Sequence, residues 1–251
     1  MRSSPLTTTR GPETITARTE SEVARPRLAR RAAAEGLAAF ALVFAGCGAI
    51  VANAQYDSAL GAVGVSLVFG LIIMVMIYAT GHLSGAHINP AVTLAFTLTR
   101  HFPGREAVAY IAAQLIGATC GALALHAVWT SDPADLGATV PSVSAGSAFV
   151  YELLLTAFLM FVIVAVATDT RAVGAAAAIA IGGTVGLDAL FGGPVTGASM
   201  NPARSFGPAL VSGTWTDFCV YLAGPILGAA LGALAYQLVR TPATPPGGEP
   251  A

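Results

Sequence analysis

The chain has 251 residues, of which 55% are apolar and only 10% are charged, and its formal net charge is −1 at pH 7. Its mean hydropathy of +0.72 lies far from that of an ordinary soluble domain. The lipid bilayer is therefore the expected solvent, which argues against a soluble globular protein, and no nucleic-acid partner is expected.

Both ends of the chain are predicted to be disordered. Residues 1–27 are rich in Thr, Ser, Arg, Glu and Pro, and residues 241–251 read TPATPPGGEPA. Such segments bury too little apolar surface to fold by themselves. We therefore predict a basic N-terminal tail over 1–27, one membrane domain over 28–240 and a C-terminal tail over 241–251.

Six apolar runs are long enough to cross a hydrocarbon layer roughly 30 Å thick as helices. Gly and Ala crowd all six, and small residues let helix backbones approach closely in lipid. The sequence therefore predicts an all-α bundle whose spans lie near residues 32–54, 59–80, 107–129, 147–168, 172–191 and 218–239.

The arginines predict the orientation of these spans, because positive residues near span ends stay in the cytoplasm. The chain has no Lys, and seven of its twelve Arg precede the first span. With the N-terminus inside, Arg100, Arg105, Arg171 and Arg240 fall on the same face, and the exception is Arg204. We expect a multi-pass protein of the cell membrane with both termini cytoplasmic.

Two segments repeat the frame [Ser/Thr]-Gly-Ala-x-x-Asn-Pro-Ala, one within residues 81–96 and one within 192–210. Glu35 in the first span corresponds to Glu152 in the fourth. Each repeat, about 28–130 and about 145–240, holds three spans and one motif. An odd number of crossings turns the second repeat upside down relative to the first.

Each motif is followed by about eleven residues compatible with helix, which reach roughly 16 Å and hence half of the hydrocarbon core. If both segments crossed fully, Arg100, Arg105 and Arg171 would move to the outer face. We therefore predict two re-entrant half-helices. Irregular backbone at membrane depth must be buried in protein or border water, so residues 82–88 and 195–200 imply a wet cavity.

Asn is a favoured N-cap residue and Pro is favoured at the first helical position, so each motif predicts a helix start. If the Asn oxygen caps its own helix, both amide hydrogens can point into a lumen as donors. Two helix N-termini at one level add about one positive charge, which repels cations and protons. The motif residues are Asn89, Pro90, Ala91, Asn201, Pro202 and Ala203.

The loop before each motif has carbonyl groups that no helix pairs, so they can accept hydrogen bonds from a passing solute. Donors at the centre and acceptors along the walls suit a neutral, hydrogen-bonding solute. The predicted carbonyls belong to Gly85, Ala86, His87 and Ile88 in the first loop and to Gly197, Ser199 and Met200 in the second.

With its two motifs, the chain resembles the major intrinsic protein family, the aquaporins and aquaglyceroporins, in a bacterial-type form over roughly residues 30–240. The resemblance implies an aquaporin-like right-handed bundle of six transmembrane helices plus two half-helices. It also implies a homotetramer in membrane lipid with a pore in each subunit. Water and small neutral solutes would pass passively, without a cofactor, a metal or catalysis.

The resemblance also implies an outer selectivity filter at Phe69, Ala189, Ala198 and Arg204. An Arg within a membrane segment is functional by default, and the alternative is a structural ion pair with Glu152 or Glu35. These two glutamates, together with His82 and His87, are expected to brace the loops.

The position of Ala189 rests on an ungapped match back from Pro194. A shift of one residue would substitute Asp188 or Leu190. Asp188 is otherwise expected to be a capping or tetramer-contact residue. His101 and His126 are expected to be peripheral.

The filter departs from two known types within the family. Strict water channels typically carry a His at the position of Ala189. Glycerol facilitators carry a second aromatic where this chain has Ala198, and an Asp where it has Ser205. The set partly resembles filters of plant and bacterial members that admit glycerol, urea or undissociated metalloid acids, so we hypothesise that solutes larger than water pass.

Two other classes of protein fit the sequence less well. An inverted-repeat secondary transporter of a small solute would need ionisable groups at its substrate site, and only Arg204 is expected there. An enzyme is not supported, because the sequence shows no nucleophile, metal cluster or phosphate loop. Cys47, Cys120 and Cys219 lie in different apolar runs without metal-ligand spacing.

Overall fold

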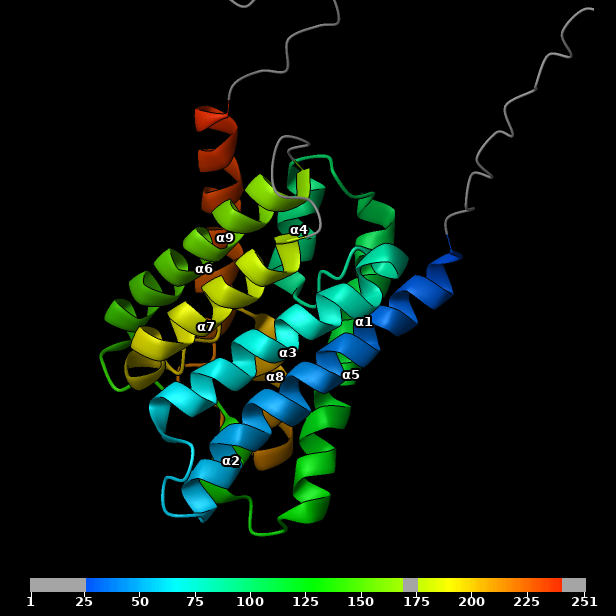
Figure 1. The fold of residues 1–251 in the computed structure, drawn as a ribbon. Coiled ribbons are helices and arrows are strands. Elements are labelled where there is room, and N and C mark those ends of the chain that lie inside the picture. Colours follow the sequence, from blue (N-terminus) through cyan, green and yellow to red (C-terminus); the bar gives the residue numbers. More distant parts are fainter. Residues whose placement is uncertain (1–25, 169–175, 241–251) are drawn as a thin grey trace, which may run out of the picture.

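The computed structural model describes residues 26–168 and 176–240 of the chain. Most of the predicted N-terminal tail, the whole C-terminal tail and Arg171 lie outside the described residues. Within them the protein is a bundle of helices without strands (Figure 1).

Six long apolar helical segments form the bundle, as the sequence predicts. The first is α1 (Leu28–Leu42), which continues through the π-helical turn η1 (Val43–Cys47) into α2 (Gly48–Gln55). The other five are α3 (Gly61–Ser84), α5 (Gly104–Val128), α6 (Ala145–Thr168), α7 (Ala177–Thr196) and α9 (Val220–Val239).

The second and fifth spans run further toward the motifs than their apolar runs indicate. α3 ends at Ser84 and α7 at Thr196, and each is followed by a left-handed glycine, Gly85 with φ 92° and Gly197 with φ 84°. Such a glycine is a common helix stop. The helix ends are therefore set by these glycines and not by the decline in hydropathy.

Two short helices follow the motifs. α4 (Pro90–Leu98) has 9 residues and α8 (Pro202–Ser212) has 11. At 1.5 Å per residue they extend about 14 and 17 Å, which is too short to cross the hydrocarbon core. The connection between α5 and α6 contains a further short helix, η2 (Pro133–Gly137).

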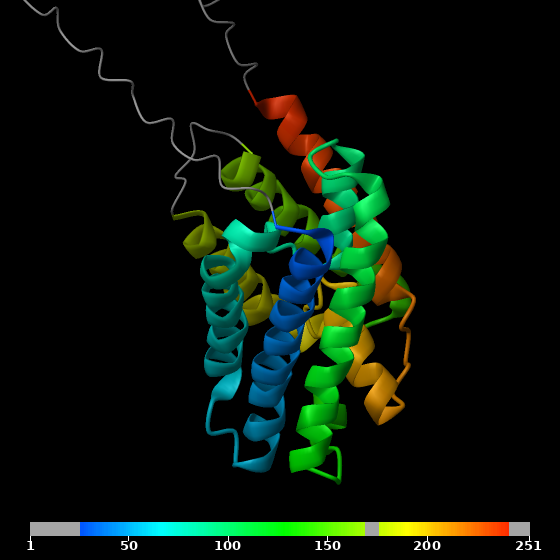
Figure 2. The ribbon, with the colours of Figure 1, turned by 90° about the vertical axis from the view of Figure 1, so that its right-hand side faces the viewer.

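The two repeats are interlocked. The pair α1 and α5 in the first repeat corresponds to the pair α6 and α9 in the second, and α3 packs against α7 between the repeats. Each half-helix packs against a helix of the other repeat, since α4 contacts α9 and α8 contacts α5. The start of α1 and the end of α9 lie at the same end of the bundle (Figure 2).

Glycines allow the closest helix crossings. A Cβ atom added at Gly117 in α5 would lie 2.7 Å from the Gly36 carbonyl carbon in α1. One added at Gly232 in α9 would lie 2.9 Å from the Ala157 carbonyl carbon in α6. The same type of close contact therefore recurs in both repeats, as expected for helices packed in lipid.

Candidate functional site

The two motif asparagines cap the half-helices as predicted from their sequence. Asn89 Oδ1 accepts a hydrogen bond of 2.8 Å from the Ala91 amide. Asn201 Oδ1 accepts bonds from the amides of Ala203, at 3.0 Å, and Arg204, at 3.3 Å. Both half-helices therefore begin at their motif, with the Pro at the first helical position.

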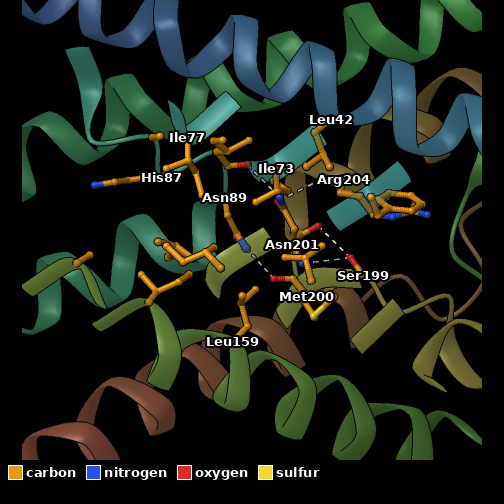
Figure 3. Close-up of a pocket in the computed structure, with 18 of the residues that line it drawn as sticks. Leu42, Ile73, Ile77, His87, Asn89, Leu159, Ser199, Met200, Asn201 and Arg204 are labelled. Carbon is orange, nitrogen blue, oxygen red and sulfur yellow. Dashed lines mark hydrogen bonds between the residues drawn. The ribbon is translucent and has the colours of Figure 1, made fainter. Parts of the chain in front are cut away.

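Each asparagine also holds the loop of the other repeat. Asn89 Nδ2 donates to the Met200 carbonyl at 2.8 Å, and Asn201 Nδ2 donates to the Ile88 carbonyl at 2.9 Å (Figure 3). The expectation that both amide hydrogens of each Asn face the lumen is therefore wrong. One hydrogen of each side chain is bound to the opposite loop, which leaves the other for a solute.

The two loops follow the same backbone course. Left-handed φ angles occur at matching positions, including non-glycine residues, and a β-branched residue such as Ile88 is rarely found there. Backbone strain of this kind clusters at functional sites. The matching φ angles are 92° and 84° at Gly85 and Gly197, 47° and 41° at Ala86 and Ala198, and 55° and 53° at Ile88 and Met200.

The Glu35 carboxylate anchors the first loop from α1. It accepts hydrogen bonds from the amides of His87, at 2.9 Å, and Ile88, at 2.6 Å. It also accepts from Ser84 Oγ at 2.7 Å and from Gln114 Nε2 at 2.9 Å. A wholly buried carboxylate is thus surrounded by donors, which compensates for its removal from water.

Glu152 does the same for the second loop from α6. It accepts from the amides of Ser199, at 2.9 Å, and Met200, at 2.8 Å, and from Thr196 Oγ1 at 2.7 Å. A tyrosine completes each anchor, because Tyr110 donates to the Ser84 carbonyl and Tyr221 to the Thr196 carbonyl, both at 2.7 Å. These two tyrosines were not among the predicted site residues. They nevertheless lie at matching places, each seven residues before one of two similar segments, GATCGAL (117–123) and GAALGAL (228–234).

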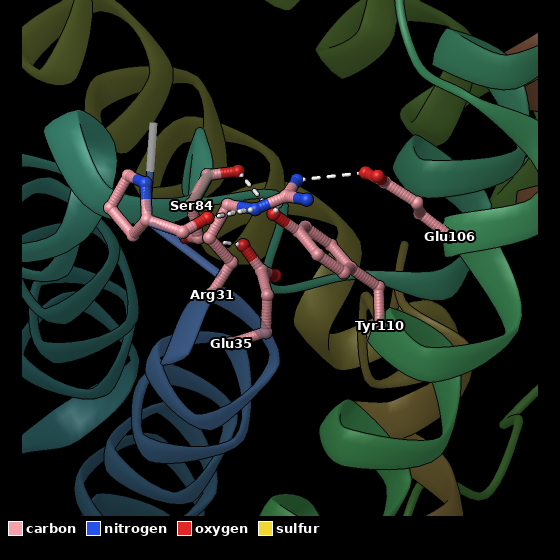
Figure 4. Close-up of polar contacts among 6 residues, drawn as sticks. Arg31, Glu35, Ser84, Glu106 and Tyr110 are labelled. Atoms are coloured by element: carbon pink, nitrogen blue, oxygen red, sulfur yellow. Dashed lines mark hydrogen bonds and ion pairs between the residues drawn. The ribbon is translucent and has the colours of Figure 1, made fainter. Parts of the chain in front are cut away.

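Arg31 connects the first anchor to the end of the bundle where α1 begins (Figure 4). Its guanidinium donates to the Pro26 carbonyl at 3.0 Å and to Glu106 Oε2 at 2.8 Å. It also lies 3.5 Å from the Tyr110 hydroxyl, which in turn holds Ser84. A continuous polar chain therefore runs from the start of α1 to the first loop.

A central cavity of about 120 Å³ lies where the two half-helices meet. Asn89 and Asn201 line it together with residues of both loops and an apolar wall that includes Ile73 and Leu159 (Figure 3). The ionisable side chains among the described residues that line it are Arg204 and His87, and no carboxylate does.

A second cavity of about 420 Å³ lies next to the first. The residues that line both cavities are Phe69, Ala189 and Arg204. Ala198 lines the central cavity and its neighbour Gly197 the second one. The four residues expected at the filter therefore lie together, at the point where the two cavities adjoin.

Arg204 is buried, with 2% of its surface exposed. Its Nη1 donates to the Gly137 carbonyl at 2.7 Å, and its guanidinium carbon lies 5.0 Å from the centre of the Phe69 ring. No ion pair joins it to Glu35 or Glu152 in the described part of the chain. The contact with Gly137 was not foreseen, because nothing near residue 137 marks it as a neighbour of the second motif.

A profile of the major intrinsic protein family matches residues 22–236. Aquaporin NIP1-1 of Zea mays is 49% identical over 207 residues, which cover 82% of this chain and 73% of that protein. Nodulin-26 of Glycine max is 46% identical over 223 residues, which cover 89% and 82%. The chain belongs to the major intrinsic protein family.

The fold agrees with this assignment. The solved aquaglyceroporin of Plasmodium falciparum superimposes with a TM-score of 0.76 at 28% identity, covering 85% of this chain and 97% of that one. As a major intrinsic protein, the chain is a passive channel for water and small uncharged solutes, and it is not an enzyme.

The histidines of this channel differ from expectation in one case. His82 lies exposed in the last turn of α3, and its side chain makes no hydrogen bond that braces the loop in the described residues, so the expected role of His82 is wrong. His87 contacts its surroundings as expected of a residue that braces the loop, with Nδ1 3.1 Å from Thr93 Oγ1 and its ring packed between Phe96 and Phe102. A sequence position next to a loop does not specify on which face of the helix a side chain lies.

Asp188 also differs from expectation. Its side chain is wholly buried within the channel subunit, lines neither cavity and has no hydrogen-bond partner among the described residues. It is therefore neither a cap nor a residue on the outer surface, where a neighbouring subunit would bind. Of the three candidates in α7, which are Asp188, Ala189 and Leu190, Ala189 is the one that lines the two cavities.

Ser205 is part of a small polar cluster behind the filter. Its hydroxyl accepts from Thr139 Oγ1 at 2.8 Å and bonds with the Ser199 hydroxyl. The cluster joins the connection after η2 to the second loop. The residue after the filter arginine thus holds the loop in place here.

Proposed function

We propose that this channel passes water and also uncharged solutes larger than water, such as glycerol, urea or undissociated metalloid acids. The proposed filter consists of Phe69, Ala189, Ala198 and Arg204. The observation that carries the proposal is the pair of methyl side chains at the junction of the two cavities, beside one aromatic ring and one guanidinium. Two methyl groups leave more room, and less polar surface, than a histidine there.

The solute is held by hydrogen bonds on one side of the pore and slides along apolar groups on the other. Asn89 and Asn201 each keep one amide hydrogen for a solute oxygen. Loop carbonyls from Gly85 to His87 and from Gly197 to Ser199 accept solute hydrogens, while the Ile88 and Met200 carbonyls already accept one bond each from an asparagine. An alcohol or an undissociated acid matches both the donors and the acceptors.

Ions and protons are excluded electrostatically. The N-termini of α4 and α8 point positive ends at the central cavity, and Arg204 adds a full positive charge. No carboxylate among the described residues lines the central cavity to compensate for these charges. A cation that enters the central cavity loses hydration and meets the positive charge of Arg204 and of both helix ends.

Water and glycerol are supported by the names of two similar proteins, since one is called an aquaporin and the solved one an aquaglyceroporin. Four subunits assemble in the plasma membrane, each with its own pore. The arginine distribution supports cytoplasmic termini.

The test is stopped-flow light scattering on proteoliposomes with water, glycerol, urea and arsenous acid. The wild type is expected to pass all four with linear, uncoupled flux. Ala189→His is expected to lower glycerol permeability at least about tenfold while keeping water permeability, because it fills the filter. Ala189→Ser, which changes size little, serves as the matched control and is expected to keep glycerol flux.

Three results would contradict the proposal. Water flux without flux of glycerol, urea or arsenous acid would restrict the channel to water. Saturable uptake driven by a proton gradient would indicate a transporter. Proton flux through the wild type would refute the electrostatic account.

A further inference from the structure

The first span contains one π-helical turn, Val43–Cys47. Such turns occur mostly singly within α-helices and are frequent at functional sites. Both Gly46 and Cys47, at the end of this turn, are buried. Neither residue was predicted from the sequence to belong to the functional site.

Gly46 lies directly against the Phe69 ring. A Cβ atom added at Gly46 would lie 2.6 Å from Phe69 Cδ1 and 2.8 Å from Cζ, with Cε1 nearer still. Real Cβ atoms do not approach other atoms so closely. Only a glycine at this position lets the ring occupy the place that it has in the structure.

The same ring forms part of the proposed filter. Phe69 lines both cavities, and the Arg204 guanidinium carbon lies 5.0 Å from its centre. A shift of the ring therefore changes the room at the junction between the cavities.

The helix behind Gly46 cannot move away from the ring. On its other side, α5 is in close contact with the first span, since a Cβ atom at Gly121 would lie 2.9 Å from the Phe40 carbonyl oxygen and 3.0 Å from Val43 Cβ. A Cβ atom at Gly48 would lie 3.2 Å from Leu125 Cδ2. The space next to the ring that is open is the pair of cavities, so a larger residue at position 46 pushes the ring into the pore.

The same turn supports the arginine of the filter. Cys47 packs against Gly137, where an added Cβ atom would lie 2.8 Å from Cys47 Cβ. The Gly137 carbonyl accepts the hydrogen bond from Arg204. One π-helical turn thus packs against both Phe69 and Gly137, whose carbonyl is the hydrogen-bond partner of Arg204.

We propose that Gly46 is a specificity-determining residue of this channel, because it provides the space into which the Phe69 ring retracts and so sets the width of the filter. This inference rests on the proposed function, in which Phe69 belongs to the filter. Gly46 itself touches no solute and acts through the ring.

The experiment measures glycerol and water permeability of proteoliposomes for the wild type, Gly46→Ala, Phe69→Val and the double variant. Gly46→Ala is expected to lower the ratio of glycerol to water permeability at least about tenfold. In the Phe69→Val background the same substitution is expected to change neither the ratio nor the melting temperature, because the ring atoms are gone. Gly183→Ala is the control, since an added Cβ atom there meets nothing within 4 Å.

The outcomes separate this inference from the proposed function. An unchanged ratio in folded Gly46→Ala would overturn the inference, as would an effect of Gly46→Ala that persists without the ring. If Gly46→Ala alone does not fold, the ratio of glycerol to water permeability in Phe69→Val, which removes the ring, decides. This ratio is expected to rise above that of the wild type, and an unchanged ratio would overturn the inference. If the wild type passes no glycerol, the proposed solute class is wrong. The inference about Gly46 is then tested by water permeability alone, which is expected to fall in Gly46→Ala and to stay unchanged when the same substitution is made in Phe69→Val.

Discussion

Asn89 and Asn201 each form hydrogen bonds through both the oxygen and the nitrogen of the side-chain amide. The oxygen accepts from the first free amides of its own half-helix, and the nitrogen donates to the loop carbonyl of the other repeat. No other side chain of this size combines an acceptor and two donors in one plane. The residue therefore joins the two repeats at the level where the solute passes.

Asn201→Asp tests this double role. The carboxylate still caps the amides of Ala203 and Arg204, but it places an oxygen against the Ile88 carbonyl in place of a donor. Loss of this buried bond is expected to lower the free energy of unfolding by about 1–3 kcal/mol. The new negative charge is expected to admit cations, which a sodium-flux assay on proteoliposomes measures.

The matched control is Asn53→Asp. Asn53 Oδ1 accepts from the amides of Leu60 and Gly61, so an aspartate keeps both bonds. The residue lines the second cavity and not the central one, so its charge lies away from the place where the half-helices meet. Sodium impermeability and unchanged stability of Asn201→Asp would contradict the role assigned to Asn201.

At the scale of elements, each loop is held by a carboxylate from one helix and a tyrosine from another. The first loop has in addition the chain that runs from Arg31 through Tyr110 to Ser84. Arg31 and Glu106 are nearly buried, with side-chain exposures of 5% and 13%. Removing one partner of such a pair leaves a poorly solvated charge, whereas removing both does not.

A double-mutant cycle of Arg31→Ala and Glu106→Ala tests this anchor. Each single substitution is expected to lower the free energy of unfolding by about 3 kcal/mol, and the double variant by clearly less than the sum. Chemical denaturation of the purified channel in detergent gives the three values. Strict additivity would mean that the two side chains are not coupled.

At the scale of the whole molecule, the bundle depends on close helix crossings within each repeat and on half-helices shared between repeats. Gly117→Val tests the crossing of α1 and α5, where the added atoms would overlap backbone atoms of Gly36. Overpacking against side chains costs about 1–3 kcal/mol, and here no rotamer change can relieve the overlap. We expect a larger loss, seen as a lower melting temperature or a failure to fold.

Gly183→Val is the control for Gly117→Val, since a Cβ atom added at Gly183 meets nothing within 4 Å. Equal melting temperatures of the two variants would show that the crossing of α1 and α5 tolerates separation.

The sequence alone determined the six spans, the two half-helices and their caps, and the match of Glu35 with Glu152. These features depend on hydropathy, on residues adjacent in the chain or on a repeat, all of which can be read locally. Only the tertiary structure decided the exchange of Asn side chains between loops, the Gly137 carbonyl opposite Arg204, the exposed place of His82 and the burial of Asp188. The physical reason is that these contacts join elements far apart in the chain, so they exist only once the helices have packed.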